Sequence, residues 1–334
     1  MKTAVVILNW NGVAHLQRFL HYVVERSAEA DVVVADNGST DDSVQWVEAT
    51  FSSVRVLRLG QNYGFAEGYN RALAMLEGYE LFVLLNSDVE PAEGWLAPLV
   101  ARFEDESVAV VGPKILSVTQ RDSFEYAGAA GGYIDFLGYP FCRGRILGTT
   151  ERDTGQYDDS RDVMWVGGAA LCCRADLYRE LGGLATEFFA HMEEIDFCWR
   201  AQLAGRRVVF EPSSQVYHLG GGTLAMDSPR KVMLNHRNNL AMLFRCASPV
   251  QRVVVAVVRP LLDVLAALSY LAAGRTEAFK AVGRAYVDFA KWHGRLASER
   301  RTIRRSVKRE ATGIYRGSIV LRYIFGSHNF GKLM

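Results

Sequence analysis

The amino-acid sequence predicts an α/β fold with a mostly parallel sheet and helices on both of its faces. Apolar runs that suit buried strands alternate with amphipathic segments over residues 1–115. Each segment between two runs is long enough for a helix, and polar residues follow several of the runs. Strands that alternate with helices of this length form βαβ units and a parallel sheet.

The strands of this first part are predicted from short apolar runs rich in β-branched residues. The run LFVLL at residues 81–85 has five apolar residues in succession, which is typical of a strand buried on both faces. The predicted strands are residues 4–8, 32–35, 54–59, 81–85 and 108–112. Apolar spacings of three and four predict helices at residues 13–25, 41–50, 66–76 and 94–104.

The remainder of the chain is less regular. Residues 116–164 are rich in Gly, Tyr, Arg and Asp, which indicates long loops. The expected elements after them are a strand at 164–174, a short helix at 175–183, a helix in the later part of 187–205 and a strand at 206–212. Long helices are expected after Pro249. We therefore expect one domain over residues 1–245 and a helical, basic region over residues 246–334.

Charge is distributed unevenly along the chain. The net charge of +1 gives no indication of a nucleic-acid partner. Residues 274–310 hold 11 Lys and Arg against 4 Asp and Glu, and residues 311–334 add +3, which leaves −9 for residues 1–273. A basic end on an acidic body suggests contact with an anionic surface such as a membrane. Five cysteines without a CxxC pair, and no signal-peptide pattern, predict a cytoplasmic protein with reduced thiols.

Polar residues stand at the ends of three predicted strands. Asn9 follows the first strand, Asp36 the second and Asp88 the strand at 81–85. Ordinary turn preferences explain one such residue but explain three together poorly. The carboxyl edge of a parallel sheet is where ligands bind. Gly64 and Gly68, in NYGFAEGYN, would allow close approach of a ligand to a helix N-terminus.

The motifs NWNG, DNGSTDDS, NYGFAEGYN, LLNSDVEP, WVGGAALCCR, FFAHMEEIDFCWR and VYHLGGGT together resemble those of family 2 glycosyltransferases. The resemblance covers about residues 3–245 and is strongest to the bacterial rhamnosyltransferase-like branch. It implies a GT-A fold, with a nucleotide-sugar half at residues 1–115 and an acceptor and catalytic half at residues 116–245.

The resemblance also implies roles for individual positions. Asp36 would read the base of the donor nucleotide. Asp88 stands in the family's DxD motif and would bind Mg²⁺ or Mn²⁺, although Asn86 replaces the first carboxylate. His218 would lie near the metal, although a lone histidine is commonly a packed or capping residue. The implied donor site comprises Asn9, Asp36, Asn62, Gly64, Phe65, Gly68, Asn70, Asn86, Ser87, Asp88 and Arg237.

Two of the implied assignments have structural alternatives. Arg237, in NHRNNL, would bind the diphosphate or be a plain surface arginine. Trp165, which begins an acceptor-side motif with Gly167 and Gly168, would stack on a sugar or be a core tryptophan. The glycines at 220–222 would let a loop close over the donor.

The catalytic base is expected in HMEEIDF. Transfer to a hydroxyl needs a group that takes its proton. Glu194 matches the family's base position, with Glu193 and Asp196 as alternatives, although acidic residues at a helix N-terminus also serve the helix dipole. Three crowded carboxylates should raise at least one pKa, which suits a base near neutrality.

The C-terminal region has two apolar segments. Residues 253–273 are long enough to span a bilayer, but Arg259, Pro260 and Asp263 interrupt them. Residues 276–309 form a basic amphipathic helix that would either dock on an anionic membrane or pack against the body or a second subunit. The family's lipid-linked acceptors favour the membrane, on its cytoplasmic face.

The sequence therefore predicts an inverting, metal-dependent glycosyltransferase. The expected donor is a nucleotide-diphosphate sugar, with dTDP-rhamnose as the best candidate and a UDP-hexose as the alternative, and the acceptor is a cell-surface or lipid-linked glycan. A non-catalytic GT-A-like scaffold is the rival from another class. A nucleotidyltransferase lacks its basic Gly-rich loop here, and a Rossmann dehydrogenase lacks GxGxxG after the first strand.

Overall fold

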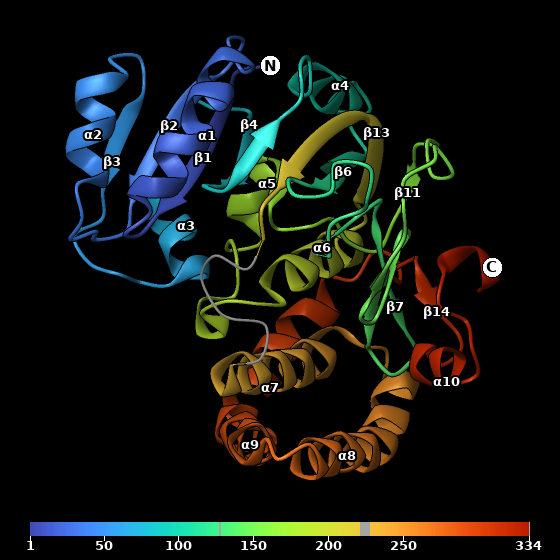
Figure 1. Ribbon diagram of the computed structural model, residues 1–334. Coiled ribbons are helices and arrows are strands. Elements are labelled where there is room, and N and C mark those ends of the chain that lie inside the picture. Colours follow the sequence, from blue (N-terminus) through green and yellow to red (C-terminus); the bar gives the residue numbers. More distant parts are fainter. Residues whose placement is uncertain (127, 221–227, 334) are drawn as a thin grey trace.

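The computed structural model describes residues 1–126, 128–220 and 228–333 and confirms the α/β fold. Its main sheet has nine strands in the order β11-β13-β6-β12-β4-β1-β2-β3, with β5 paired to β13. Four neighbouring strands come from the first 86 residues: β1 (Thr3–Asn9), β2 (Asp31–Asp36), β3 (Arg55–Arg58) and β4 (Leu81–Asn86). They pair in parallel, in register from Ala4 opposite Asp31 to Asn9 opposite Asp36. The predicted βαβ half is therefore present (Figure 1).

The other half of the sheet is mixed. The strand predicted at 108–112 does not pair with β4, because β12 lies between them and runs antiparallel to both. The strand predicted at 206–212 is longer and runs parallel to β6. The strands of this half are β5 (Val89–Pro91), β6 (Val108–Ser117), β11 (Arg161–Asp162), β12 (Ala170–Arg174) and β13 (Arg207–His218).

The expectation of long loops over residues 116–164 is wrong in part. This segment carries short antiparallel strands that form most of a second, five-stranded sheet. They were missed because each has two to four residues, too few to show a period of two. The strands are β7 (Gly132–Asp135), β8 (Pro140–Cys142), β9 (Arg145–Ile146) and β10 (Thr149–Thr150), and β14 (Ile314–Tyr315) completes the sheet.

Helices cover the main sheet and bury its apolar side chains on both faces. The predicted helices of the first half lie within a few residues of the observed ones. They are α1 (Val13–Glu25), α2 (Ser43–Thr50), α3 (Phe65–Ala74) and α4 (Leu96–Ala101), which continues as the short 3-10 helix Arg102–Glu104. In the second half α5 (Ala175–Glu180), the 3-10 helix Thr186–Phe188 and α6 (Glu193–Leu203) follow β12.

Helices dominate the C-terminal region, at the end of the molecule away from the blue N-terminal strands (Figure 1). The helical part begins at Pro229, before the expected boundary at residue 246. The chain then returns, and β14 pairs in parallel with β7. The division at residue 245 stays a prediction. The helices are α7 (Pro229–Cys246), α8 (Pro249–Ala272), α9 (Thr276–Arg305) and α10 (Ile319–Ile324), with a last 3-10 turn at Phe330–Lys332.

Candidate active site

The ends of β1 and β2 meet at the carboxyl edge of the sheet, as predicted. Asn9 and Asp36 pair in register there, and both are buried. The carboxylate of Asp36 accepts hydrogen bonds from the Ser39 backbone N–H at 3.3 Å. Asp36 and residues 38–41 line a cavity of about 350 Å³ that opens between β2 and the loop after β3. This cavity is the natural place for a base that Asp36 would read.

The glycine-containing loop before α3 is held by an asparagine that sequence reasoning left out of the site. Asn37 Nδ2 donates to the Asn62 side-chain carbonyl at 3.2 Å and to the Gly64 carbonyl at 3.0 Å. Its own carbonyl oxygen accepts from the Tyr63 N–H at 3.0 Å. The predicted donor residues Asn62 and Gly64 are therefore parts of one hydrogen-bonded loop.

At Gly64 and Gly68 the group that approaches the backbone closely is a protein side chain, and the space expected for a ligand is filled. Gly64 has a φ of 80°, and a Cβ there would lie 2.5 Å from the ring of Phe189. A Cβ on Gly68 would lie 2.9 Å from Leu8. The backbone N–H of Phe65 donates to the Phe189 carbonyl at 2.8 Å. The start of α3 is thus joined to the loop that precedes α6.

Asn70 is a correction to the predicted donor site. Its side-chain oxygen accepts from the Tyr178 hydroxyl at 2.6 Å and from the Leu184 N–H at 2.9 Å. Its Nδ2 donates to the Leu184 carbonyl at 2.8 Å. An amide bonded in this way bridges α3 to the segment after α5, and has little capacity left for a nucleotide.

The ends of β4 and β13 bring Asp88 and His218 into contact. His218 Nε2 lies 3.2 Å from Asp88 Oδ1 and 3.4 Å from Asn86 Nδ2, and His218 Nδ1 lies 3.3 Å from Glu125 Oε2. Burial alone would lower the pKa of His218, but the carboxylates of Asp88 and Glu125 outweigh it and raise the pKa to about 10. Burial likewise opposes ionisation of Asp88, yet His218 lowers its pKa. Glu125 is the site neighbour that the sequence did not reveal.

Asp88 and His218 are the side chains at this point that could hold a divalent cation. Among the described residues no group of three His, Cys, Asp or Glu side chains is arranged to hold a metal ion. Asp88 nevertheless supplies one carboxylate, and Mg²⁺ is commonly held by one or two carboxylates together with phosphate oxygens of the substrate. His218 would supply an imidazole once the cation displaces the proton that Asp88 and Glu125 hold on its ring. The two residues therefore fit a cation that the donor itself helps to bind.

Glu193 and Glu194 stand at the N-terminus of α6. Glu193 is buried, whereas Glu194 keeps part of its surface exposed. Each has a buried Oε2 atom without a hydrogen-bond partner in the described chain. The side chain of Glu194 passes over Gly168, whose added Cβ would lie 3.6 Å from it. The predicted base and this acceptor-side glycine therefore lie together.

These two carboxyl groups have raised pKa values. Burial raises the pKa of Glu194 to about 7. Burial, together with the adjacent charge of Glu194, raises the pKa of Glu193 well above its usual value. Burial also raises the pKa of the Cys142 thiol, and the charges of both Glu125 and Glu194 add to that effect. Glu125 of the Asp88–His218–Glu125 cluster and Glu194 of α6 therefore both lie within electrostatic reach of one buried thiol.

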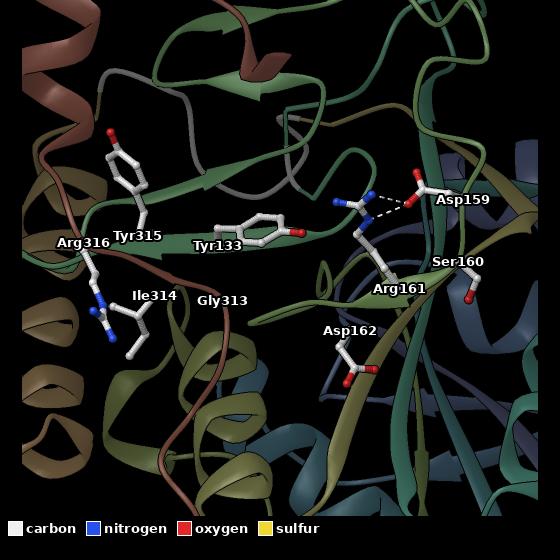
Figure 2. A pocket seen from close by; sticks show the side chains of 9 residues that line it. All are labelled: Tyr133, Asp159, Ser160, Arg161, Asp162, Gly313, Ile314, Tyr315 and Arg316. Atoms are coloured by element: carbon white, nitrogen blue, oxygen red, sulfur yellow. Dashed lines mark hydrogen bonds and ion pairs between the residues drawn. The ribbon is translucent and has the colours of Figure 1, made fainter. Parts of the chain in front are cut away.

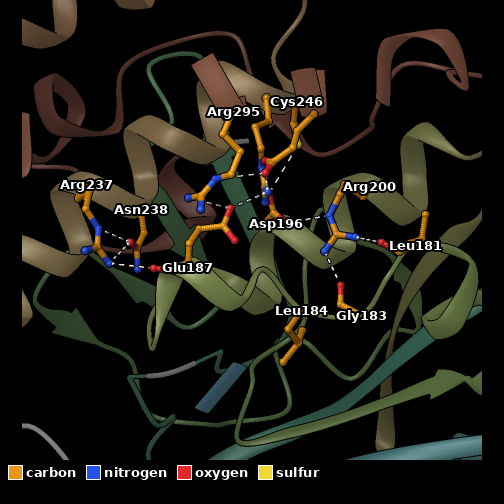
Figure 3. Close-up of polar contacts among 12 residues, drawn as sticks. Leu181, Gly183, Leu184, Glu187, Asp196, Arg200, Arg237, Asn238, Cys246 and Arg295 are labelled. Carbon is orange, nitrogen blue, oxygen red and sulfur yellow. Dashed lines mark hydrogen bonds and ion pairs between the residues drawn. The ribbon is translucent and has the colours of Figure 1, made fainter. Parts of the chain in front are cut away.

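Asp196 is not available as a base. It is fully buried and pairs with Arg200 at 2.8 Å and with Arg245 (Figure 3). Burial opposes its ionisation, but the two arginines outweigh this effect and lower its pKa. Arg200 also donates to the carbonyls of Leu181 and Gly183 at 2.8 and 2.7 Å. Asp196 therefore belongs to a buried ionic network that fixes α6.

The loop before α6 has an unusual backbone, with positive φ at Phe189 (64°), His191 (72°) and Met192 (72°). Such values cost free energy in non-glycine residues and persist only when neighbours enforce them. Asn238 enforces them here, because its Nδ2 lies within 3.0 Å of the carbonyls of Phe188, Ala190 and His191.

Arg237 takes part in the same support. It donates to the Glu187 carbonyl at 3.2 Å (Figure 3) and to the Phe188 carbonyl at 3.3 Å. Its guanidinium lies 4.3 Å from the Trp292 ring centroid. It is buried, so it is not the surface arginine of the alternative interpretation, and its donors are directed at the loop and not at a diphosphate.

Trp165 is a core tryptophan, the second of the two roles considered for it. It is 2% exposed, and its indole N–H donates to the Tyr133 carbonyl at 2.9 Å. A Cβ on Gly132 would lie 2.1 Å from its ring, so the tryptophan fills the core against a glycine. Gly167 packs against Gly128 and is also buried, which leaves Gly168 as the acceptor-side residue that reaches the site. Gly220 contacts Glu125, and Gly221 and Gly222 lie outside the described residues.

A larger hollow of about 690 Å³ lies elsewhere, between residues 159–162 and the returning segment 313–316 (Figure 2). None of its lining residues is a predicted site residue. Three of its four charged side chains already pair with protein, Arg161 with Asp159 and Asp162 with Arg207; the fourth is Arg316. We therefore place the functional site at the sheet edge and the start of α6.

Comparisons with known proteins identify what the chain is similar to. Residues 4–148 match the family described as glycosyl transferase family 2. The chain is 27% identical over 258 residues to N-acetylglucosaminyl-diphospho-decaprenol L-rhamnosyltransferase of Mycobacterium tuberculosis, which covers 72% of this chain and 83% of that protein. It is 31% identical over 196 residues to pre-mycofactocin glycosyltransferase of the same organism, covering 56% of this chain and 37% of the relative.

Solved structures share the fold. The mannosyltransferase PcManGT from Pyrobaculum calidifontis, in complex with GDP-Man and Mn²⁺, aligns with a TM-score of 0.52 at 16% identity over 91% of this chain and 85% of its own. GalNAc-T7 with UDP, GalNAc and Mn²⁺ aligns with a TM-score of 0.59 at 18% identity, over 73% of this chain and 48% of its own. The resemblance seen in the motifs is therefore confirmed: residues 4–148 match glycosyl transferase family 2, the chain is similar to a rhamnosyltransferase, and it is a glycosyltransferase with a GT-A fold.

Proposed function

We propose that this glycosyltransferase is inverting and metal-dependent, and that it moves a sugar from a nucleotide-diphosphate donor to a glycan or lipid-linked glycan. The observation that carries the proposal is Glu194. It is a half-buried carboxylate with an unpartnered oxygen and a pKa of about 7, beside Gly168 at the entrance to α6. A group with these properties is suited to accept a proton at neutral pH.

The proposed reaction is a single displacement. The acceptor hydroxyl oxygen forms a bond to the anomeric carbon of the donor sugar, and its proton passes to the Glu194 carboxylate. The bond from the anomeric carbon to the diphosphate oxygen breaks, and its electron pair leaves with the diphosphate. One base on the acceptor side and a direct attack give inversion at the anomeric carbon.

The sheet edge is assigned to the donor. Asp36 and the cavity beside it would take the nucleoside. Asp88 and His218 would hold Mg²⁺ or Mn²⁺, which supplies positive charge for the departing diphosphate. The two solved relatives that were crystallised with Mn²⁺ support a divalent ion in this fold.

The sugar and the acceptor are proposed from relatives. A curated relative is named for transfer of L-rhamnose to a decaprenol-linked N-acetylglucosaminyl diphosphate. We therefore propose dTDP-rhamnose as the donor and a lipid-linked or growing cell-surface glycan as the acceptor. An acceptor of this kind places the enzyme at the cytoplasmic face of the membrane, as a peripheral protein.

The test is an assay with Mn²⁺, a polyprenyl-diphosphate N-acetylglucosamine acceptor and separate donors: dTDP-rhamnose, UDP-hexoses and GDP-mannose. We expect release of dTDP coupled to transfer of rhamnose, and thermal stabilisation by dTDP with Mn²⁺. At 100 times its Kd a nucleotide adds about 2.7 kcal/mol to the free energy of unfolding.

Turnover of a UDP-hexose alone would replace the donor assignment. Binding of nucleotides without turnover of any donor would favour the scaffold interpretation instead.

A further inference from the structure

Helix α8 (Pro249–Ala272) is inverted relative to an ordinary surface helix: it turns apolar side chains outward and polar ones inward. Its outer face shows branched aliphatic residues with exposed fractions of 48–66%. They recur at spacings of three and four and so form one continuous strip, which contains no charged residue. Six of them define this outer strip: Val253, Val257, Leu261, Val264, Leu265 and Leu268.

The charged residues of α8 face the protein. Arg259 is 2% exposed and Asp263 1% exposed. Arg259 donates to the Leu137 carbonyl and to the Asn239 side chain, each at 2.8 Å, and Asp263 accepts from the Tyr286 hydroxyl at 2.7 Å. The expectation that Arg259 and Asp263 interrupt the apolar run is therefore wrong for the outer strip. Pro260 lies in the middle of the helical span and does not interrupt the strip either.

Helix α9 behaves in the opposite way. Its apolar residues Ala281, Val282 and Leu296 are buried against the other helices. Apart from Val287, which is 56% exposed, what it presents outward is mainly charge, including Lys280, Arg284 and Lys291. The apolar face of the predicted amphipathic helix is therefore used for packing against the body, and it is not free to dock on a membrane.

A second exposed apolar group lies next to the start of α8. Leu321, Ile324 and Phe325 of and after α10 are 53%, 68% and 83% exposed. Helices α10 and α8 are both bonded to the same short segment: the Ile319 N–H of α10 donates to Asp135, and Gln251 Nε2 of α8 donates to the carbonyl of the next residue, Phe136. Figure 1 shows α8 and α10 at the same margin of the molecule.

We propose that the outer strip of α8 inserts into the interfacial layer of an anionic bilayer, with the helix lying in the membrane plane. Among the described helices α8 alone is long and apolar enough to cross a membrane. It cannot leave the body to do so without breaking the buried contacts of Arg259 and Asp263, which would leave those charges unpaired. An apolar strip with charge kept off it is what interfacial insertion requires.

Charge favours a lipid surface over a second copy as the occupant. Residues 274–334 carry a net charge of +10, whereas residues 1–273 carry −9. Two copies that meet through α8 would bring two basic regions together, but an anionic bilayer would attract them. Membrane insertion deepens the proposed function, because its biological purpose rests on the lipid-linked acceptor proposed above. Its physical test needs no sugar.

The first experiment labels the strip. All five native cysteines are buried, so a cysteine introduced by Leu265→Cys can be labelled selectively with an environment-sensitive fluorophore. Met75→Cys, at a position 49% exposed beyond the end of α3, is the matched control. With phosphatidylglycerol–phosphatidylcholine vesicles we expect a blue shift, and quenching by a lipid-phase quencher, for residue 265 and not for residue 75. Equal responses at both positions would overturn the proposal.

The second experiment measures binding. The double variant Leu261→Asp with Leu265→Asp should reduce vesicle flotation at least about tenfold, and Met75→Asp should leave it unchanged. Added salt should weaken wild-type flotation. Undiminished flotation of the double variant would overturn the proposal. A wild-type protein that is a dimer, with a double variant that is a monomer, would also overturn it, since the strip would then join two copies.

A turnover assay with a short water-soluble acceptor tests the proposed function independently of membrane binding. It measures release of the nucleotide from the donor. The double variant should retain it at the wild-type rate. Loss of membrane binding with retained turnover supports both proposals. Absence of turnover in the wild type would contradict the proposed function while leaving the vesicle result to decide the role of α8.

Discussion

The sheet edge and the start of α6 are both rich in polar side chains, but they use them differently. At the sheet edge Asn37 and Asn62 are bonded to backbone groups and to each other, although Asn9 Oδ1 has no partner in the described chain. At α6 the side chains of Glu193 and Glu194 each keep a buried oxygen without a partner. Polar side chains whose hydrogen bonds are all made within the protein fix the shape of a loop. A buried polar atom without a hydrogen-bond partner costs free energy, and it is suited to bind a substrate or to accept a proton.

Glu193 and Glu194 both keep an unpartnered oxygen in the described chain, and we expect Glu194 to be the reactive one. Glu194→Gln keeps size and hydrogen bonding and removes basicity, so kcat should fall by about 10²–10⁴-fold. Donor Kd, measured by calorimetry, should change little, because the base acts on the acceptor. Glu193→Gln is the matched variant and should cost less. A dead Glu193→Gln enzyme beside an active Glu194→Gln enzyme would move the base by one residue.

Two acidic residues of the same helix sharpen the comparison further. Asp196 is held by Arg200 and Arg245, so Asp196→Asn should act on folding and not on chemistry. Breaking a buried ion pair by removing one charge costs about 3–5 kcal/mol of unfolding free energy. Urea denaturation should show this loss for Asp196→Asn and a much smaller change for Glu194→Gln. Equal stability of the two variants would contradict the assignment.

The pH dependence follows from the raised pKa of Glu194. The base must be ionised, and burial places its pKa at about 7, so kcat should fall about tenfold per pH unit below 7 and level off above it. The effect on stability has the opposite sign. The folded-state pKa lies above the ordinary value of 4.5, so this group stabilises the fold fully below 4.5 and loses that contribution as pH rises to 7. A flat rate profile between pH 5.5 and 7 would exclude this base.

The smallest effect is expected at a residue that supports the reactive loop without touching substrate. Asn238→Ala removes the donor that holds three loop carbonyls, and should cost about 1–3 kcal/mol of stability. It should also lower kcat with donor Kd unchanged, because the loop sets the direction of α6. Asn239→Ala is the control, since Asn239 bonds to Gly138 and Arg259 and reaches the loop only through a 3.9 Å contact with the Met192 sulfur. Equal kcat in the two variants would show that the loop keeps its conformation without Asn238.

Much of this protein is determined by the sequence alone. The period of apolar residues predicted β1 to β4 and the helices between them, because a strand buried on both faces and an amphipathic helix each need their own pattern. Residues at strand ends, such as Asn9 and Asp36, were found for the same reason, since parallel strands bring their carboxyl ends to one edge. The motifs also identified the family and pointed to Glu194.

Only the tertiary structure decided what each polar side chain contacts. Asn70, Asp196 and Arg237 look like site residues in their motifs, but their partners are far away in sequence, at Leu184, Arg245 and Glu187. Glu125 carries no motif and reaches His218 through folding. The direction of α8 was hidden for the same reason: composition records that Arg259 is present, and only packing decides whether a charge on a helix faces water, lipid or protein.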